Sequence, residues 1–141
     1  MRLYLGNKNY SSWSMRPWVL MRALGLPFEE EMLYFDSFEP GSQFKQQILR
    51  VNPTGRVPTL LIDGDAVWDS LTIAETLNDS FPQAGVWPEA SADRALARSL
   101  CAEMHAGFSM LRSLCPMNIE ASLPEIGSEM MGKDGVSGLS G

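Results

Sequence analysis

The sequence predicts an α/β fold that continues into a purely helical segment. Strand-like and helix-like segments follow one another in the order β-α-β-α-β-β-α over residues 1–80, a pattern typical of a sheet covered by helices. A stretch with two prolines and a glycine, FPQAGVWPEAS at 81–91, separates these segments from a continuous helical pattern. With 141 residues and a hydrophobic content of 45%, the chain is large enough to bury a core.

The first strand and the first helix are predicted as follows. RLYL at 2–5 is rich in large apolar residues and ends at a glycine, which predicts a short strand. SMRPWVLMRAL at 14–24 predicts a helix that stops at Gly25. Because Pro17 lacks an N–H group and fits only a first turn, this helix should begin near Ser12 to Ser14, with Ser14 as the structural N-cap. One helical face carries Met15, Trp18, Val19, Arg22 and Ala23.

The next segments complete the sheet. The predicted elements are, in order, a strand at 28–35, a helix at 43–51 and strands at 57–62 and 66–68. The sequence DGD between the last two strands is a strong hairpin signal, so these strands should be antiparallel. A helix joins the first two strands, which should therefore be parallel. Either Asp69 or Ser70 is expected to cap the helix that follows, LTIAETLNDSF.

The C-terminal part is predicted to be helical at first and irregular later. Residues 81–91 are expected to link a first domain at 1–80 to a partial helical domain at 92–141. The sequence at 92–114 predicts one long uninterrupted helix. Its apolar face should pack against the first domain or its neighbours and stay partly exposed; this face carries Leu96, Leu100, Met104 and Leu111. The glycine- and serine-rich tail at 127–141 is expected to be mobile.

Composition excludes several classes of function. A net charge of −6 argues against nucleic-acid binding, and no apolar run approaches the roughly 20 residues that cross a bilayer. The N-terminus lacks the apolar stretch of a signal peptide, which predicts a cytoplasmic protein. Cys101 and Cys115 are expected to be reduced and buried. Because His105 is the only histidine, we expect no metal site, and we expect His105 to be a surface or core residue and not a catalytic one.

Three motifs resemble segments of the glutathione S-transferase family. SSWSMR at 11–16 is similar to the S-S-x-S-x-R signature of the zeta class, and NPTGRVPTL at 52–60 to the N-P-x-x-x-V-P-x-L segment with its cis Val-Pro peptide. DGDAVWDSLTIAETL at 63–77 is similar to the family's hairpin, acid-Ser pair and following helix. The motifs occur in the family's order, and the match extends from residue 1 to about residue 120. The resemblance implies a thioredoxin-like domain at 1–80, followed by the first part of an all-helical domain.

The resemblance also implies an enzyme that conjugates glutathione, its co-substrate, to a small electrophile, and it implies a homodimer. A free thiol titrates near ~8.5, so the thiolate of glutathione must be stabilised at neutral pH. A serine hydroxyl at a helix N-terminus can donate a hydrogen bond to it. Ser11 is the first candidate and Ser12 the second, and Tyr10 remains open. Trp13 is a candidate to line the thiol pocket, with a packing role as the alternative. The alternative role for the serines is local capping.

Five further residues are implied to bind glutathione. The backbone of Val57, beside Pro58, can pair with the cysteinyl backbone as an added strand would. Arg56 suits the glycine carboxylate, with a solvated arginine as the alternative. The Ser70 hydroxyl and the helix N–H groups can hold the γ-glutamyl carboxylate, and Asp69 can accept from the γ-glutamyl ammonium.

Two other functions are weighed against this one. A glutathione-binding module without turnover is the first, because the helical part is short. A glutathione-dependent isomerase of the maleylacetoacetate type is the second, and it is disfavoured because Trp13 stands where zeta enzymes carry a cysteine. A thiol oxidoreductase is weaker still, since residues 9–18 contain no cysteine. The residues do not specify the electrophile.

Overall fold

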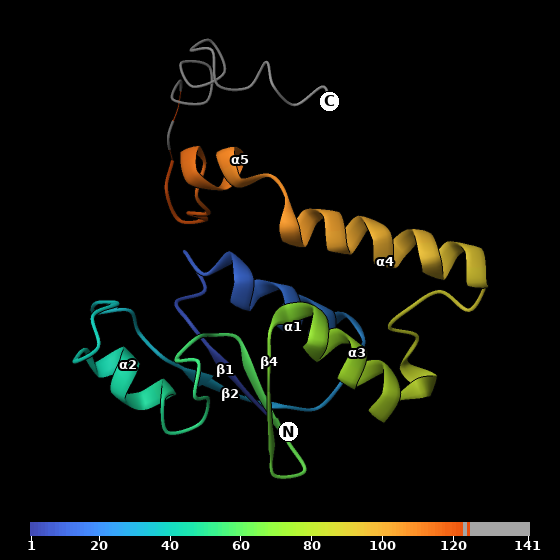
Figure 1. Ribbon diagram of the computed structural model, residues 1–141, viewed down its shortest axis with the longest axis horizontal. Helices are drawn as coiled ribbons and strands as arrows, with labels where there is room; N and C mark the ends of the chain where they lie inside the picture. Colours follow the sequence, from blue (N-terminus) through green and yellow to red (C-terminus); the bar gives the residue numbers. More distant parts are fainter. Residues whose placement is uncertain (123, 125–141) are drawn as a thin grey trace.

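The computed structural model describes residues 1–122 and 124, and within them it contains one four-stranded mixed sheet (Figure 1). The strands are β1 (Arg2–Leu5), β2 (Glu29–Met32), β3 (Thr59–Ile62) and β4 (Asp65–Trp68), in the spatial order β2-β1-β3-β4. β1 pairs with β2 in parallel, and β3 pairs with β1 and β4 in antiparallel fashion. The predicted order, the parallel first pair and the hairpin are therefore confirmed.

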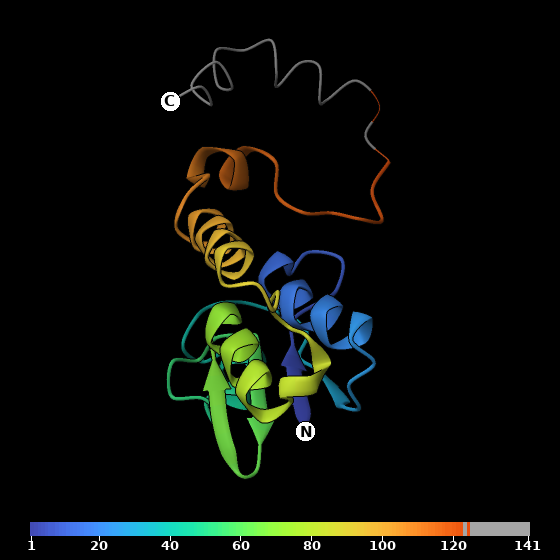
Figure 2. The same cartoon turned by 90° about the vertical axis from the view of Figure 1, so that its right-hand side faces the viewer.

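Helices cover both faces of this sheet. α1 (Ser12–Ala23) and α3 (Ser70–Ser80) pack with one face, and α2 (Gln43–Ile48) packs with the other. A 3-10 turn, η1 (Pro82–Ala84), follows α3 and leads to α4 (Ser91–Ala106) and α5 (Ser109–Leu114). Both views show α4 beyond α1 and α3, on the side away from the sheet (Figures 1 and 2). The α/β fold followed by a helical segment is thus as predicted.

The alternation of side chains along β1 divides the core in two. Leu3 and Leu5 point to the face covered by α1 and α3, where they join the fully buried Met21, Leu60 and Ile73. Tyr4 points to the opposite face and packs against the cluster of Leu33, Phe44 and Ile48. Each fully buried side chain of this size contributes about 1.5–3 kcal/mol of transfer free energy. This packing fixes α1 and α3 side by side on the sheet.

Helix α1 buries a different face from the one predicted. Its buried residues are Ser14, Pro17 and Met21, whereas Val19 on the predicted face is half exposed. The N-cap is Ser11, so the prediction that Ser14 caps the helix is wrong. Ser14 lies inside the first turn, where its hydroxyl accepts the backbone N–H of Gly6 at 3.0 Å. A hydrogen-bonded serine is stable on a buried face, and hydrophobic periodicity alone does not reveal that.

The predicted long helix at 92–114 is broken into α4 and α5. The chain leaves the helix at Gly107, and Phe108 adopts the left-handed conformation with φ 59°. A Cβ atom at position 107 would lie 2.9 Å from the carbonyl oxygen of Glu103, so only glycine fits this close approach. The guanidinium of Arg112 then donates to the carbonyls of Met104 and Gly107 at the end of α4.

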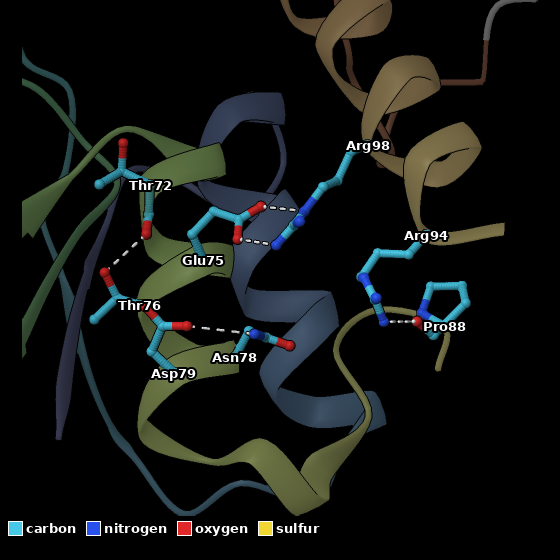
Figure 3. A network of polar contacts seen from close by, with 8 residues as sticks. All are labelled: Thr72, Glu75, Thr76, Asn78, Asp79, Pro88, Arg94 and Arg98. Atoms are coloured by element: carbon cyan, nitrogen blue, oxygen red, sulfur yellow. Dashed lines mark hydrogen bonds and ion pairs between the residues drawn. The ribbon is translucent and has the colours of Figure 1, made fainter. Parts of the chain in front are cut away.

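Two arginines of helix α4 bond to α3 and to the linker that precedes α4. Arg98 donates to the two carboxylate oxygens of Glu75 in α3 at 2.9 and 2.6 Å, and Arg94 donates to the carbonyl of Pro88 at 3.0 Å (Figure 3). Met104 lines a cavity together with residues of α1 and α3, whereas Leu96 and Leu100 are 60% and 56% exposed. The prediction that these leucines pack on the first domain is therefore wrong, and the prediction that apolar side chains of this helix stay partly exposed is confirmed.

Three further expectations can be compared with the structure. Cys101 and Cys115 are free and exposed, not buried. Cys101 lines a cavity that α4 forms with α1 and α3. No helix among the described residues is long and apolar enough to cross a membrane. The predicted mobile tail at 127–141 lies outside the described residues.

The side chain of Glu30 ties β2 to α1 and to the loop between β1 and α1. Its carboxylate accepts from Lys8, from Arg22 and from the Trp18 indole at 2.8 Å. Burial alone would raise the pKa of Glu30, but the three hydrogen bonds together lower it to about 2. Glu30 therefore stabilises the fold through its charged form.

We predict that acid removes this contribution. Because the folded pKa lies below the unfolded value of 4.5, the stabilisation is complete above pH 4.5 and is lost as the pH falls towards 2. Glu30→Gln should lower the free energy of unfolding at pH 7 by about 1–3 kcal/mol and flatten its dependence on pH below 4.5. Urea unfolding of both forms between pH 2 and 7 measures this.

Glu29→Gln is the matched control for this prediction. Glu29 pairs with Arg2 at 2.8 Å on the exposed surface, where ion pairs contribute little. Equal losses of unfolding free energy in the two variants would show that Glu30 stabilises the fold no more than a surface ion pair does.

Candidate functional site

One cavity of about 730 Å³ lies where the N-termini of α1 and α3 meet the loop before β3 and the end of α4. Its volume falls in the range of small-molecule sites, roughly 300–1,000 Å³. All the predicted site residues line it, namely Ser11, Ser12, Trp13, Arg56, Val57, Pro58, Asp69 and Ser70. Tyr10 lines it as well. Segments far apart in the sequence are thus brought together around one space.

The serine cluster forms a short hydrogen-bonded chain at the N-terminus of α1. The Ser11 hydroxyl donates to that of Ser14 at 2.8 Å, and Ser14 also accepts the N–H of Gly6. A hydroxyl has one proton and two lone pairs, and its proton rotates to suit its partners. Ser14 can therefore donate to Ser11 when Ser11 donates to a group in the cavity. Ser11 is the N-cap yet makes no side-chain capping bond, so Ser14 is the partner from which its hydroxyl proton turns to such a group.

Ser12 and Tyr10 flank Ser11 and differ from it in exposure. Ser12 is the first residue of α1 and is exposed, and Tyr10 is 55% exposed. Ser11 is 8% exposed and is held by its backbone N–H, which donates to the Asn7 carbonyl at 2.8 Å. A buried, fixed donor loses less conformational entropy on binding than an exposed one. This favours Ser11 as the donor to a thiolate, and Ser12 and Tyr10 remain candidates.

The loop before β3 is built around Asn52, which is fully buried. Its amide donates to the Arg56 carbonyl at 3.0 Å and to the Thr59 hydroxyl at 2.9 Å, while its oxygen accepts from Thr54. The peptide bond between Val57 and Pro58 is cis, as the resemblance implied. This network presents Arg56, Val57 and Pro58 to the cavity.

Two cations lie at this end of the cavity. Arg56 is exposed, and no described residue forms an ion pair with it. Lys45 of α2 donates to the Gly55 carbonyl at 2.7 Å and also lines the cavity. Their charge suits a carboxylate at this end.

Asp69 is held in an uncommon backbone conformation at the start of α3. Its φ of 75° and ψ of 133° lie in a region that residues other than glycine rarely adopt. One carboxylate oxygen caps the helix by accepting the N–H of Leu71 at 2.9 Å, and the other lies 3.2 Å from Nε2 of His105. Strained residues of this kind cluster at functional sites, because strain persists only where the surroundings enforce it. The carboxylate is thereby fixed at the cavity wall.

Ser70 follows Asp69 and carries an unsatisfied hydroxyl. Its Oγ is buried and has no hydrogen-bond partner among the described residues. A buried polar group without a partner costs about 1–3 kcal/mol, so a ligand that supplies a partner removes this cost. Ser70 was expected as a possible N-cap, but Asp69 fills that role. The Ser70 hydroxyl is therefore not needed to cap the helix.

Trp13 is surrounded by basic side chains. The guanidinium groups of Arg16 and Arg112 lie 4.1 and 4.7 Å from the centre of its ring, and the His105 ring meets it edge-on at 5.0 Å. Burial, and then repulsion from Arg112, lowers the pKa of Arg16 below its usual value. In a chain with a net charge of −6, this local positive charge favours an anion near the N-terminus of α1.

Sequence reasoning missed several residues that line the cavity. His105 was expected to be an ordinary surface or core residue, and it instead contacts both Asp69 and Trp13. The further lining residues that were not predicted include Phe35, Phe38, Phe44, Lys45 and Trp68. The three phenylalanines contact one another with ring centres 4.9–5.9 Å apart. The hydrophobic sequence around them resembles any core segment, so no local signal marks them as site residues.

The Ser70→Ala variant separates binding from folding. Because Asp69 caps α3, loss of the Ser70 hydroxyl should leave the free energy of unfolding unchanged or slightly higher. If the hydroxyl binds a carboxylate, the affinity for glutathione should fall about tenfold. Calorimetric titration and thermal melts measure the two quantities. A loss of stability with unchanged affinity would assign Ser70 to the fold alone.

Comparison with known proteins identifies the family. The model described as "Glutathione S-transferase, N-terminal domain" matches residues 10–80. The chain belongs to the glutathione S-transferase family. Its four-stranded sheet and flanking helices are the thioredoxin-like N-terminal fold of these transferases, followed by a helical region.

Individual relatives agree with this assignment. A probable maleylacetoacetate isomerase of Caenorhabditis elegans is 31% identical over 112 residues, which are 79% of this chain and 50% of the relative. Maleylacetoacetate isomerase of Dictyostelium discoideum is 28% identical over the same shares of both chains. A crystal structure of a glutathione transferase homologue from Burkholderia, with bound glutathione, matches with a TM-score of 0.65 and 34% identity and covers 79% of this chain and 57% of that one. The chain thus spans about half the length of the curated relatives it matches.

Proposed function

We propose that this transferase-family chain binds glutathione in the cavity and joins it through its thiol sulfur to a carbon of a small electrophile, which releases a leaving group such as a halide ion. One observation carries the proposal. A single cavity joins the Ser11 hydroxyl at a helix N-terminus to the fixed Asp69 carboxylate and the unsatisfied Ser70 hydroxyl. One cavity therefore contains both a hydroxyl that can donate to a thiolate and groups that can bind the ammonium and carboxylate of an amino acid.

The cavity chemistry matches glutathione along its length. At one end, Asp69 accepts from the γ-glutamyl ammonium, while Ser70 and the N-terminus of α3 hold the carboxylate of the same residue. In the middle, Val57 offers its backbone to the cysteinyl unit. At the other end, Arg56 and Lys45 face the glycine carboxylate.

The chain's contribution to the reaction is to favour the thiolate. Glutathione supplies the thiol sulfur, which is the nucleophile once its proton has passed to solvent. In this structure Ser11 donates to Ser14. When glutathione binds, the Ser11 hydroxyl proton turns to the anionic sulfur, and the Ser14 hydroxyl can then donate to Ser11. The positive end of α1 adds to this stabilisation. Trp13 and Phe35 restrict the access of water to this part of the cavity.

A glutathione-dependent isomerase is the second candidate. It is favoured by the maleylacetoacetate isomerases among the relatives. Trp13, in place of the cysteine of zeta enzymes, remains the observation against it. A binding module without turnover is the third candidate, because the chain covers about half of those relatives.

Affinity and turnover distinguish the three candidates. The transferase should be retained on immobilised glutathione and should conjugate a generic aryl halide. A binding module would be retained without conjugation. Isomerisation of a cis-dienoic acid that needs glutathione but consumes none would favour the isomerase. A chain that glutathione does not retain and that does not conjugate would refute the proposal.

We also infer a cytoplasmic homodimer. The free, exposed Cys101 and Cys115 suit a reducing compartment, where glutathione is in its thiol form. Exposed apolar side chains on α4 and α5 favour association, namely Leu96, Leu100, Met104, Met110 and Leu111.

Association is tested on the purified chain. Light scattering should give a mass above that of the monomer, and Leu96→Lys combined with Leu100→Lys should reduce it. Ser99→Lys on the same helix is the control for added charge. A monodisperse monomer would contradict the inference.

A further inference from the structure

The segment after α5 returns to the loop that carries Ser11. Asn9 lies in this loop, 8% exposed, and its side chain makes both of its hydrogen bonds to Glu120. The amide oxygen of Asn9 accepts the backbone N–H of Glu120 at 2.9 Å, and its amide nitrogen donates to the Glu120 carboxylate at 3.2 Å. The backbone carbonyl of Asn9 also accepts the N–H of Ile119 at 3.4 Å.

Three consecutive residues anchor this loop, each to a different part of the fold. Asn7 accepts the backbone N–H of Phe35 at 2.8 Å, and Lys8 pairs with Glu30 of β2. Both of these partners belong to the sheet domain. Asn9 is the anchor to the helical part, through a residue 111 positions away in the chain. Ser11 follows two residues later, with its own N–H bonded to Asn7.

We propose that Asn9 and Glu120 form a positioning pair that holds the Ser11 loop in its thiolate-stabilising geometry. The segment 117–120 would then position the Ser11 loop from outside the cavity, which it does not line. This inference rests on the proposed function, because it assigns the pair a role in presenting Ser11. Asn9 and Glu120 touch neither glutathione nor the electrophile.

The geometric demand of the reaction gives such a pair its importance. A hydrogen-bond donor aimed at a developing charge must be held within about 0.5 Å of its productive position. Misplacement by about 1 Å can lower a rate about 100-fold. In the Ser11 loop, Asn9 stands between Lys8 and Tyr10, and Tyr10 is largely exposed. Loss of the Asn9 anchor would therefore free the residue that precedes the thiolate donor by two positions.

The polarity of the pair allows a swap experiment. In Asn9→Asp, one carboxylate oxygen can still accept the Glu120 N–H, but the other faces the Glu120 carboxylate and repels it. In Glu120→Gln, the Asn9 amide retains an acceptor, so this variant is the matched control. When both substitutions are combined, the amide introduced at position 120 can donate to the carboxylate introduced at position 9. The double variant therefore restores both hydrogen bonds, with the polarity of the bond between the side chains reversed.

The expected results follow from this design. Asn9→Asp should lower kcat for conjugation about 10- to 100-fold and raise the pKa of the bound thiol, with KM for glutathione changed less than about threefold. It should also increase amide hydrogen exchange at Tyr10 and Ser11. Glu120→Gln should resemble the wild type, and the double variant should recover kcat, thiol pKa and exchange protection together.

Three outcomes decide the inference. If the wild-type chain binds glutathione as a thiolate and Asn9→Asp keeps the wild-type rate and thiol pKa, the positioning role of the pair is refuted and the proposed function stands. Failure of the double variant to recover would also overturn the positioning role. A wild-type chain that binds no thiolate would overturn the proposed function and this role with it. Should Asn9→Asp unfold in thermal melts, Glu120→Ala, which removes the acceptor without adding repulsion, should show the same changes to a smaller degree.

Discussion

Ser11→Ala should lower the rate of conjugation by about 10- to 1,000-fold while changing glutathione affinity by less than about threefold. The variant removes the proposed hydrogen bond to the thiolate and leaves Asp69, Ser70 and Arg56, which line the same cavity and are proposed to hold the rest of the tripeptide. Stopped-flow or steady-state assays with an aryl halide give the rate, and calorimetric titration gives the affinity. Ser11 makes no side-chain cap, but its hydroxyl donates to the buried Ser14, so the free energy of unfolding should fall by about 0.5–1.5 kcal/mol.

Ser12→Ala and Tyr10→Phe are the matched controls for this prediction. Both residues line the same cavity and flank Ser11, but both are exposed. Each control should retain activity within about threefold. Should Ser11→Ala be silent and either control lose activity, the role of thiolate donor would move to that residue.

Asp69→Asn should weaken glutathione binding about 10- to 100-fold. The substitution removes the negative charge that attracts the γ-glutamyl ammonium, and it keeps an oxygen that can cap α3 by accepting the N–H of Leu71. Asparagine also tolerates a positive φ better than most residues. The free energy of unfolding should therefore change by less than about 1 kcal/mol.

Asp69→Ala tests the same position without the cap. It should lose the affinity of Asp69→Asn and, in addition, about 1–2 kcal/mol of stability, because the cap and the tolerance for φ 75° are both gone. Calorimetry and urea unfolding measure the two effects. Full affinity in Asp69→Asn would remove Asp69 from the binding site and leave it as a cap.

Most of the fold was predictable because its signals are local. The strand at 2–5, the hairpin around DGD and the cap at Asp69 each depend on a few neighbouring residues, and all three are present. The buried face of α1 was not predictable in this way. Ser14 is buried because its hydroxyl bonds to Gly6 and Ser11, and hydrophobic periodicity treats such a serine as a surface residue.

The break between α4 and α5 has a similar explanation. Helical periodicity continues through Gly107 in the sequence, and the close approach to the Glu103 carbonyl that ends α4 appears only in three dimensions. The apolar spacing of Leu96 and Leu100 likewise predicted a packed face. In the structure, Arg98 and His105 of α4 pair with carboxylates of the sheet domain, while Leu96 and Leu100 are exposed.

The candidate site was predictable where motifs carry it and not where tertiary contacts do. Ser11, Pro58 and Ser70 lie in three motifs of the first 80 residues, and they line one cavity. His105 and Glu120 come from the helical part, and nothing near them in the sequence points to Asp69 or Asn9. Such pairs are formed by the packing of α4 and the chain after α5, which local patterns do not specify.

The central claim, that this cavity holds glutathione as a thiolate, is tested most directly by ultraviolet titration of the thiol in the complex. Free thiols titrate near ~8.5. The pKa of the bound thiol should lie at least about one unit lower in the wild-type chain, and it should return towards the free value in Ser11→Ala. A bound thiol that titrates at the free value in the wild-type chain, or a chain that binds no glutathione at all, would contradict the account.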